Sequence, residues 1–99
     1  MLETAPVAIV VCGKPEVQSG ISEGYWPQDC AAATENMLLT AVSLGYGACW
    51  CGIYPVQRID AFQELLGVTS IPFSIIAMGV PDEEPASRGY YDETKVTWL

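Results

Sequence analysis

The sequence predicts one domain in which the elements follow one another as strand, helix, short strand, helix, strand and polar tail. Two near-continuous apolar runs, at residues 5–12 and 71–78, each end in a turn that contains Gly and Pro. Continuous rather than alternating hydrophobicity is typical of strands covered on both faces. Between these runs lies a long stretch of helix formers without Gly or Pro. A length of 99 residues allows a single domain.

The stretch from Gln28 to Leu44 is predicted to form a helix that is apolar almost all round. Only two of its side chains are charged, and Gly45 follows as a candidate left-handed stop. A chain of this size can hardly cover every face of such a helix, and an apolar face that stays open usually marks an interface. We therefore expect a homodimer formed through this helix; a central core helix without a partner is the alternative.

The second half of the chain is predicted to hold a short strand at residues 48–53, a second helix and the strand at 71–78. Pro55 suits the first turn of that helix, and Gly67 suits its end. Its apolar stripe consists of Val56, Ile59, Phe62 and Leu66.

Composition excludes several classes of function. Four basic against twelve acidic residues give a net charge of −8, which repels nucleic acid and anionic lipid. Histidine is absent, which removes Ser-His-Asp and Cys-His catalysis and the usual zinc ligand sets. The longest apolar run, at residues 5–12, is too short to span a bilayer. We expect neither a nucleic-acid partner nor a membrane partner.

The four cysteines contain no C-x-x-C pair, and the first residues lack the basic region of a secretory signal. We therefore expect free thiols in a reducing cytoplasm. Cys49 and Cys51 would share one face of a strand with their Cβ atoms about 7 Å apart, too far for an easy disulfide. A metal or thiol-redox centre is disfavoured, because the ligand spacing and histidine are both wanting.

Several short motifs occur in a fixed order. They are residues 5–11 as a strand, Trp26 with 29–33 opening a helix, 35–39 within it, the Leu-Gly-Tyr-Gly-Ala-Cys-Trp-Cys-Gly run at 44–52, Glu-Leu-Leu-Gly at 64–67, Ala-Met-Gly-Val-Pro at 77–81 and a downstream arginine. In this order they resemble the C-terminal half of the FMN-dependent nitroreductase family, and the resemblance covers nearly the whole chain.

The resemblance implies an α+β fold in which an apolar central helix packs on a mixed or antiparallel sheet. It also implies a two-fold dimer with FMN held at the interface. Such proteins transfer reducing equivalents from NAD(P)H to nitroaromatics, quinones or related small aromatic acceptors in a ping-pong reaction. The flavin carries the electron chemistry, and the protein supplies position and electrostatics.

The resemblance also implies site residues. Cys51 and Gly52 match the place where the family's backbone lies against the isoalloxazine ring, with Trp50 beside them. Arg88 matches the region of a basic residue that contacts the FMN phosphate, a group that suits a guanidinium fork. The alternatives are that Gly52 is a simple bend, Trp50 a core aromatic and Arg88 a solvated surface residue. No catalytic residue and no metal ligand are assigned.

One departure from the family bears on function. Members carry an arginine-rich FMN-phosphate motif near the start of an N-terminal half, whereas the basic residues here, Lys14, Arg58, Arg88 and Lys95, are isolated. We therefore expect residues 1–99 to form a single domain that corresponds to the C-terminal half, without the N-terminal half. The alternative function is a non-catalytic dimerisation or binding module that retains the fold but not the flavin.

Overall fold

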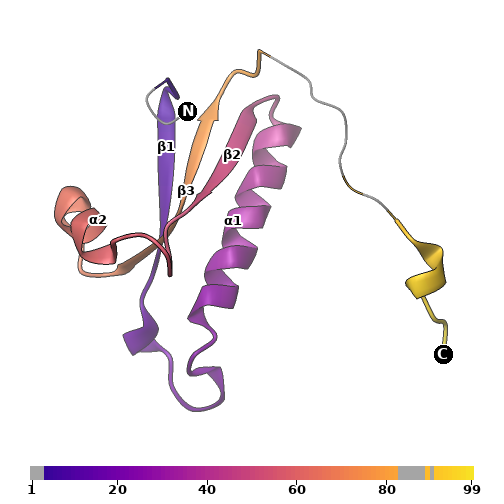
Figure 1. The fold of residues 1–99 in the computed structure, drawn as a ribbon, viewed down its shortest axis with the longest axis horizontal. Coiled ribbons are helices and arrows are strands. Elements are labelled where there is room, and N and C mark those ends of the chain that lie inside the picture. Colours follow the sequence, from indigo (N-terminus) through magenta and orange to yellow (C-terminus); the bar gives the residue numbers. More distant parts are fainter. Residues whose placement is uncertain (1–3, 83–88, 90) are drawn as a thin grey trace.

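The computed structural model describes residues 4–82, 89 and 91–99, and it confirms the predicted α+β class and order of elements (Figure 1). The strands and helices are β1 (Val7–Gly13), α1 (Trp26–Ser43), β2 (Gly47–Gly52), α2 (Ile59–Leu66) and β3 (Ile71–Gly79). Short 3-10 turns occupy Pro15–Val17, Gly20–Ser22 and Glu93–Lys95. Within the described ranges, neither helix is long and apolar enough to cross a membrane.

The three strands form one antiparallel sheet in the order β1-β3-β2. The strand that comes last in the chain is therefore the central one, which agrees with its continuous apolar sequence. Pro72 interrupts this strand at the point where the β1 register shifts, between Val11 and Cys12. A proline donates no N–H, and an irregularity in the ladder is where a strand tolerates one.

Helix α1 covers one face of the sheet (Figure 1). The core between them is built on Val11, Cys30 and Ile76, with Ile9, Trp26, Leu38, Ala48 and Phe73 packed around it. Gly45, at φ +85°, ends the helix as predicted, and Tyr46 N–H closes the end by donating to the Ala41 carbonyl at 2.9 Å.

A pair of fully buried hydroxyls ties α1 to the central strand. Thr34 and Ser74 both have no exposed surface, and their hydroxyl oxygens are 2.9 Å apart. Thr34 Oγ1 also donates to the carbonyl of Cys30 at 2.7 Å. Because that bond uses the only hydrogen of the Thr34 hydroxyl, Ser74 is the donor between the two hydroxyls.

The prediction that the second helix begins at Pro55 was wrong. The helix begins at Ile59, and the residues before it form a turn that Gln57 closes by donating its N–H to the Ile53 carbonyl at 2.8 Å. Val56 is consequently 86% exposed and takes no part in the apolar stripe. The predicted end is confirmed, because Gly67 adopts the left-handed conformation at φ +67°.

Candidate functional site

The candidate site is the end of β2, where Trp50, Cys51 and Gly52 lie on an edge of the sheet. No other described strand pairs with the outer side of β2. The N–H of Ile53 donates to the carbonyl of Phe73 at 3.0 Å, just beyond the last register pair of β2 and β3. Inward and outward backbone groups alternate along an antiparallel strand. Trp50 and Gly52 therefore direct their N–H groups away from β3, towards any ligand at this edge.

Gly52 differs from the other glycines of the sheet in having no neighbour that requires the absence of a side chain. A Cβ at Gly13 would overlap the ring of Trp26, and one at Gly79 would lie 3.0 Å from Pro6 Cδ. A Cβ at Gly52 would meet nothing within 4 Å, and its φ is not positive. Neither packing nor backbone conformation within the described chain explains this glycine. The space beside it can admit a flat ligand against the backbone.

Aromatic side chains gather next to this edge. Trp50, which is 38% exposed, has its ring centroid 6.2 Å from that of Phe73. Tyr54 stacks on Phe73 at 6.4 Å and meets Trp26 edge-on at 4.7 Å. Trp26, Trp50, Tyr54 and Phe73 thus form an aromatic cluster. Trp50 lies at its partly exposed edge and is not a fully buried core residue. Sequence analysis missed Tyr54, because its sequence context signals only a turn.

The side chain of Cys51 points away from that of Trp50, because successive residues of a strand alternate between faces. Ala48, on the same face as Trp50, packs on the core beneath α1, so Cys51 lies on the opposite face. Burial raises the pKa of its thiol above the ordinary 9.0, and the charge and hydrogen bond of Cys49 raise it further. The thiol is therefore protonated at neutral pH and is not a nucleophile.

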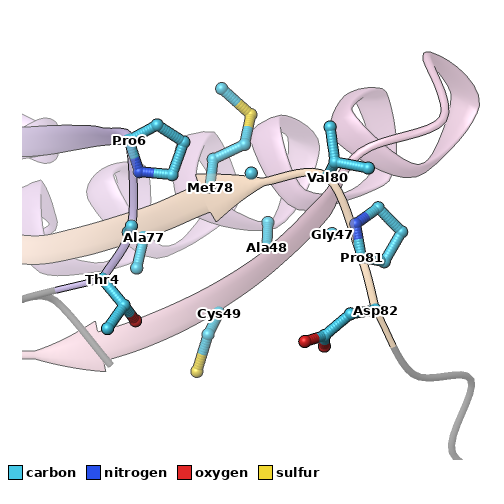
Figure 2. A pocket seen from close by; sticks show the side chains of 12 residues that line it. Thr4, Pro6, Gly47, Ala48, Cys49, Ala77, Met78, Val80, Pro81 and Asp82 are labelled. Carbon is cyan, nitrogen blue, oxygen red and sulfur yellow. The ribbon is translucent and has the colours of Figure 1, made fainter.

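The remaining predicted site residue, Arg88, lies outside the described residues. A cavity of about 510 Å³ opens at the other end of β2 (Figure 2). Gly47, Ala48 and Cys49 line it from β2, and Asp82 contributes a carboxylate. Among the described residues, no basic side chain lines it. An acidic cavity of this kind does not suit a phosphate group.

A second surface of interest is the exposed side of α1. Leu39 is 60% exposed, Val42 69% and Leu44 68%. Beside them an apolar groove of about 480 Å³ runs between the helix and the sheet, with Met37 and Tyr46 among its lining residues. Within the described residues, the helix is therefore not enclosed by its own chain.

The fold and the site together define a two-layer α+β protein with a ligand-accessible strand edge. The model of the nitroreductase family matches residues 1–80, and the chain belongs to that family.

Individual relatives agree with this assignment. A Methanothermobacter thermautotrophicus protein, provisionally described as an NADH dehydrogenase/NAD(P)H nitroreductase, is 40% identical over 97% of this chain and 51% of its own length. An Archaeoglobus fulgidus protein of the same description is 46% identical over 85% of this chain and 49% of its own length. The structure of an FMN-dependent nitroreductase from Clostridium difficile superposes with a TM-score of 0.81 at 26% identity, over 97% of this chain and 58% of that one. The chain thus spans about half the length of the relatives it matches.

Proposed function

We propose that this chain forms the C-terminal half of an FMN-dependent, nitroreductase-like oxidoreductase. Such a protein transfers reducing equivalents from NAD(P)H to nitroaromatic or quinone-type acceptors. The observation that carries the proposal is Gly52, whose N–H faces outward from an open strand edge and whose missing side chain nothing in the described chain fills. Family membership and the FMN-dependent Clostridium difficile neighbour support the choice of flavin as the ligand.

The residues present fit one side of a flavin ring. A bound FMN would supply the redox chemistry between NAD(P)H and the acceptor. The outward N–H of Gly52 would donate a hydrogen bond to an acceptor atom of the ring, and such a donor favours negative charge on it. The half-exposed ring of Trp50 would cover the apolar margin of the ligand and exclude water from it.

Most of the positive charge that would bind the FMN phosphate has to come from outside this chain. The chain carries a net charge of −8, and Arg58 already pairs with Asp60 at 3.3 Å. We propose that Arg88 contributes to the phosphate site and that the remaining cations belong to an N-terminal half like that of the longer relatives. Residues 1–99 would then be one domain of a two-part fold.

We also propose a homodimer formed through α1. Leu39 and Val42 of α1, with Leu44 directly after its end, make an exposed apolar surface that the described chain leaves open. Apolar patches of this kind are usual at interfaces between subunits. In the proposed assembly, burial of this surface would bring two copies of the domain together around the flavin, within the cytoplasm.

A matched pair of variants tests the flavin edge. Gly52→Val puts a side chain into the open space beside the strand, whereas Ala61→Leu adds the same number of carbon atoms to an exposed position of α2. We expect Gly52→Val to weaken FMN binding at least tenfold, equivalent to about 1.4 kcal/mol. Ala61→Leu should bind FMN as the unmodified chain does.

The measurement is quenching of flavin fluorescence, on a chimera in which the N-terminal half of the Methanothermobacter relative precedes this chain. Urea unfolding checks that both variants remain folded. Equal FMN affinity for Gly52→Val and Ala61→Leu would remove Gly52 from the proposed site.

A further inference from the structure

A separate cavity, of about 360 Å³, lies where β1 ends and α1 begins. The chain leaves β1, passes through two short 3-10 turns and returns to the start of α1 (Figure 1). Residues of β1, of the first turn and of α1 line the cavity, and none from β2 does. Its volume is in the usual range of small-molecule sites and far exceeds the about 30 Å³ that one water molecule occupies. The cavity therefore has room for a small organic ligand.

The apolar part of its wall is held in place by packing. The ring of Trp26 lies so close to the backbone of Gly13 that a Cβ at this glycine would overlap it. The same ring meets Tyr54 edge-on at 4.7 Å. Val17, from the first 3-10 turn, adds an aliphatic side chain. An apolar group of a ligand would find this surface already formed.

The polar part of the wall contains a hydrogen-bond acceptor without a donor. Gln18 Nε2 donates to Asp29 Oδ2 at 2.8 Å, and this bond decides which end of the amide carries the oxygen. That oxygen, Oε1, is buried and accepts no hydrogen bond from any described residue. A buried acceptor without a donor is costly. A small rotation of the amide would present Oε1 to a donor in the cavity.

Two opposite charges line the same cavity, and in the described part of the chain they are paired neither with each other nor with another side chain. Lys14 supplies an ammonium group and Asp29 a carboxylate. The ion pair that the described residues do form joins Arg58 and Asp60. A ligand that carries both charges would give Lys14 and Asp29 a partner each. A purely anionic ligand would be repelled by the net charge of −8.

We infer that this cavity binds a zwitterionic α-amino acid with an apolar side chain. The ammonium group of the ligand donates to the Asp29 carboxylate and to Gln18 Oε1, because its three hydrogens can serve both oxygens. Its carboxylate pairs with Lys14, and its side chain packs on Trp26. The site involves no residue of the proposed flavin edge, and its occupation does not depend on the proposed redox function.

The test follows the amide signals of the ¹⁵N-labelled chain by NMR during titration with L-leucine to millimolar concentration. We expect saturable shifts that include the side-chain amide of Gln18. L-Leucinamide keeps the ammonium group but lacks the carboxylate, and it should bind about fivefold more weakly, the upper value for an exposed ion pair. N-acetyl-L-leucine keeps the carboxylate but lacks the ammonium group, and it should not saturate.

Lys14→Met removes the partner of the ligand carboxylate. It should weaken the binding of L-leucine about fivefold and leave the binding of L-leucinamide unchanged, because that ligand has no carboxylate to pair. Lys95→Met is the matched control, since it removes the same charge from an exposed position in the C-terminal 3-10 turn. It should bind L-leucine as the unmodified chain does. The spectra of the free variants show whether they are folded.

Three results would overturn the inference. The first is an unmodified chain that shows no saturable shift at Gln18 with L-leucine. The second is equal binding of L-leucine and N-acetyl-L-leucine, which would exclude the contact of the ammonium group with Asp29. The third is a folded Lys14→Met variant that loses no affinity for L-leucine, or that loses as much for L-leucinamide, which would exclude the contact with the carboxylate.

Discussion

Replacing Thr34 by valine should show how strongly α1 is held on the central strand. The substitution keeps the shape of the side chain but removes the hydroxyl that accepts from Ser74 and donates to the Cys30 carbonyl. Ser74 then keeps a fully buried O–H without a partner, and leaving such a group unsatisfied costs about 1–3 kcal/mol. Ser74→Ala should cost less, about 0.5–1.5 kcal/mol, because Thr34 retains its bond to the carbonyl.

The double variant separates the bond between the hydroxyls from the other effects of the two substitutions. Since both partners are gone, its loss should fall short of the sum of the single losses by about 0.5–1.5 kcal/mol. Thr40→Val is the matched control: this hydroxyl makes the same kind of bond, to the Asn36 carbonyl at 2.8 Å, on an exposed part of α1. It should change the unfolding free energy by no more than about 0.5 kcal/mol.

Urea unfolding, followed by far-ultraviolet circular dichroism, measures all four variants. Additive losses for the two buried residues, or a Thr34→Val variant as stable as Thr40→Val, would refute the assignment of this bond as the tie between α1 and β3.

Three further predictions follow from packing, titration and exposure. Gly13→Ala should destabilise the fold by about 1–3 kcal/mol in urea, because its Cβ would overlap the ring of Trp26; unchanged stability would contradict that packing. Burial raises the pKa of the Cys30 thiol above 9.0, so its contribution to stability is complete below pH 9 and is lost as the pH rises beyond it. The fall in stability above pH 9 should therefore be shallower in Cys30→Ala, and an equal slope would argue against this cause. Val42→Asp should lower the sedimentation coefficient towards that of a monomer, whereas Val56→Asp, at an exposed position outside α1, should leave it unchanged. Equal sedimentation coefficients for the two variants would remove α1 from the interface.

The sequence was informative about elements and much less so about their arrangement. The apolar run at 71–78 correctly predicted a strand, and Ser74 to Ala77 are buried within it, but it did not predict that both other strands would pair with it in antiparallel order. Pairing depends on contacts between distant parts of the chain, and periodicity reports only local exposure. The same limit explains why Thr34 was missed: its partner, Ser74, is forty residues away.

The candidate site was only partly predictable, because its geometry also depends on contacts between distant parts of the chain. A glycine at position 52 was visible in the sequence, and the family resemblance gave it a meaning. That its N–H faces an open edge follows only from the position of β2 outside β3. That no described residue fills the place of its side chain follows only from the packing. Val56 shows the opposite case, where an apolar residue with correct helical spacing lies in a turn and is exposed.

Gel filtration with FMN shows directly whether the edge of β2 forms part of a flavin site. The chain and the chimera carrying the relative's N-terminal half would each be mixed with FMN, separated from free flavin and examined by visible absorption. Flavin absorbance should elute with the chimera at one FMN per copy of this chain, and the chain alone should retain less. A folded chimera that elutes colourless would contradict the claim that this strand edge is one side of a flavin site.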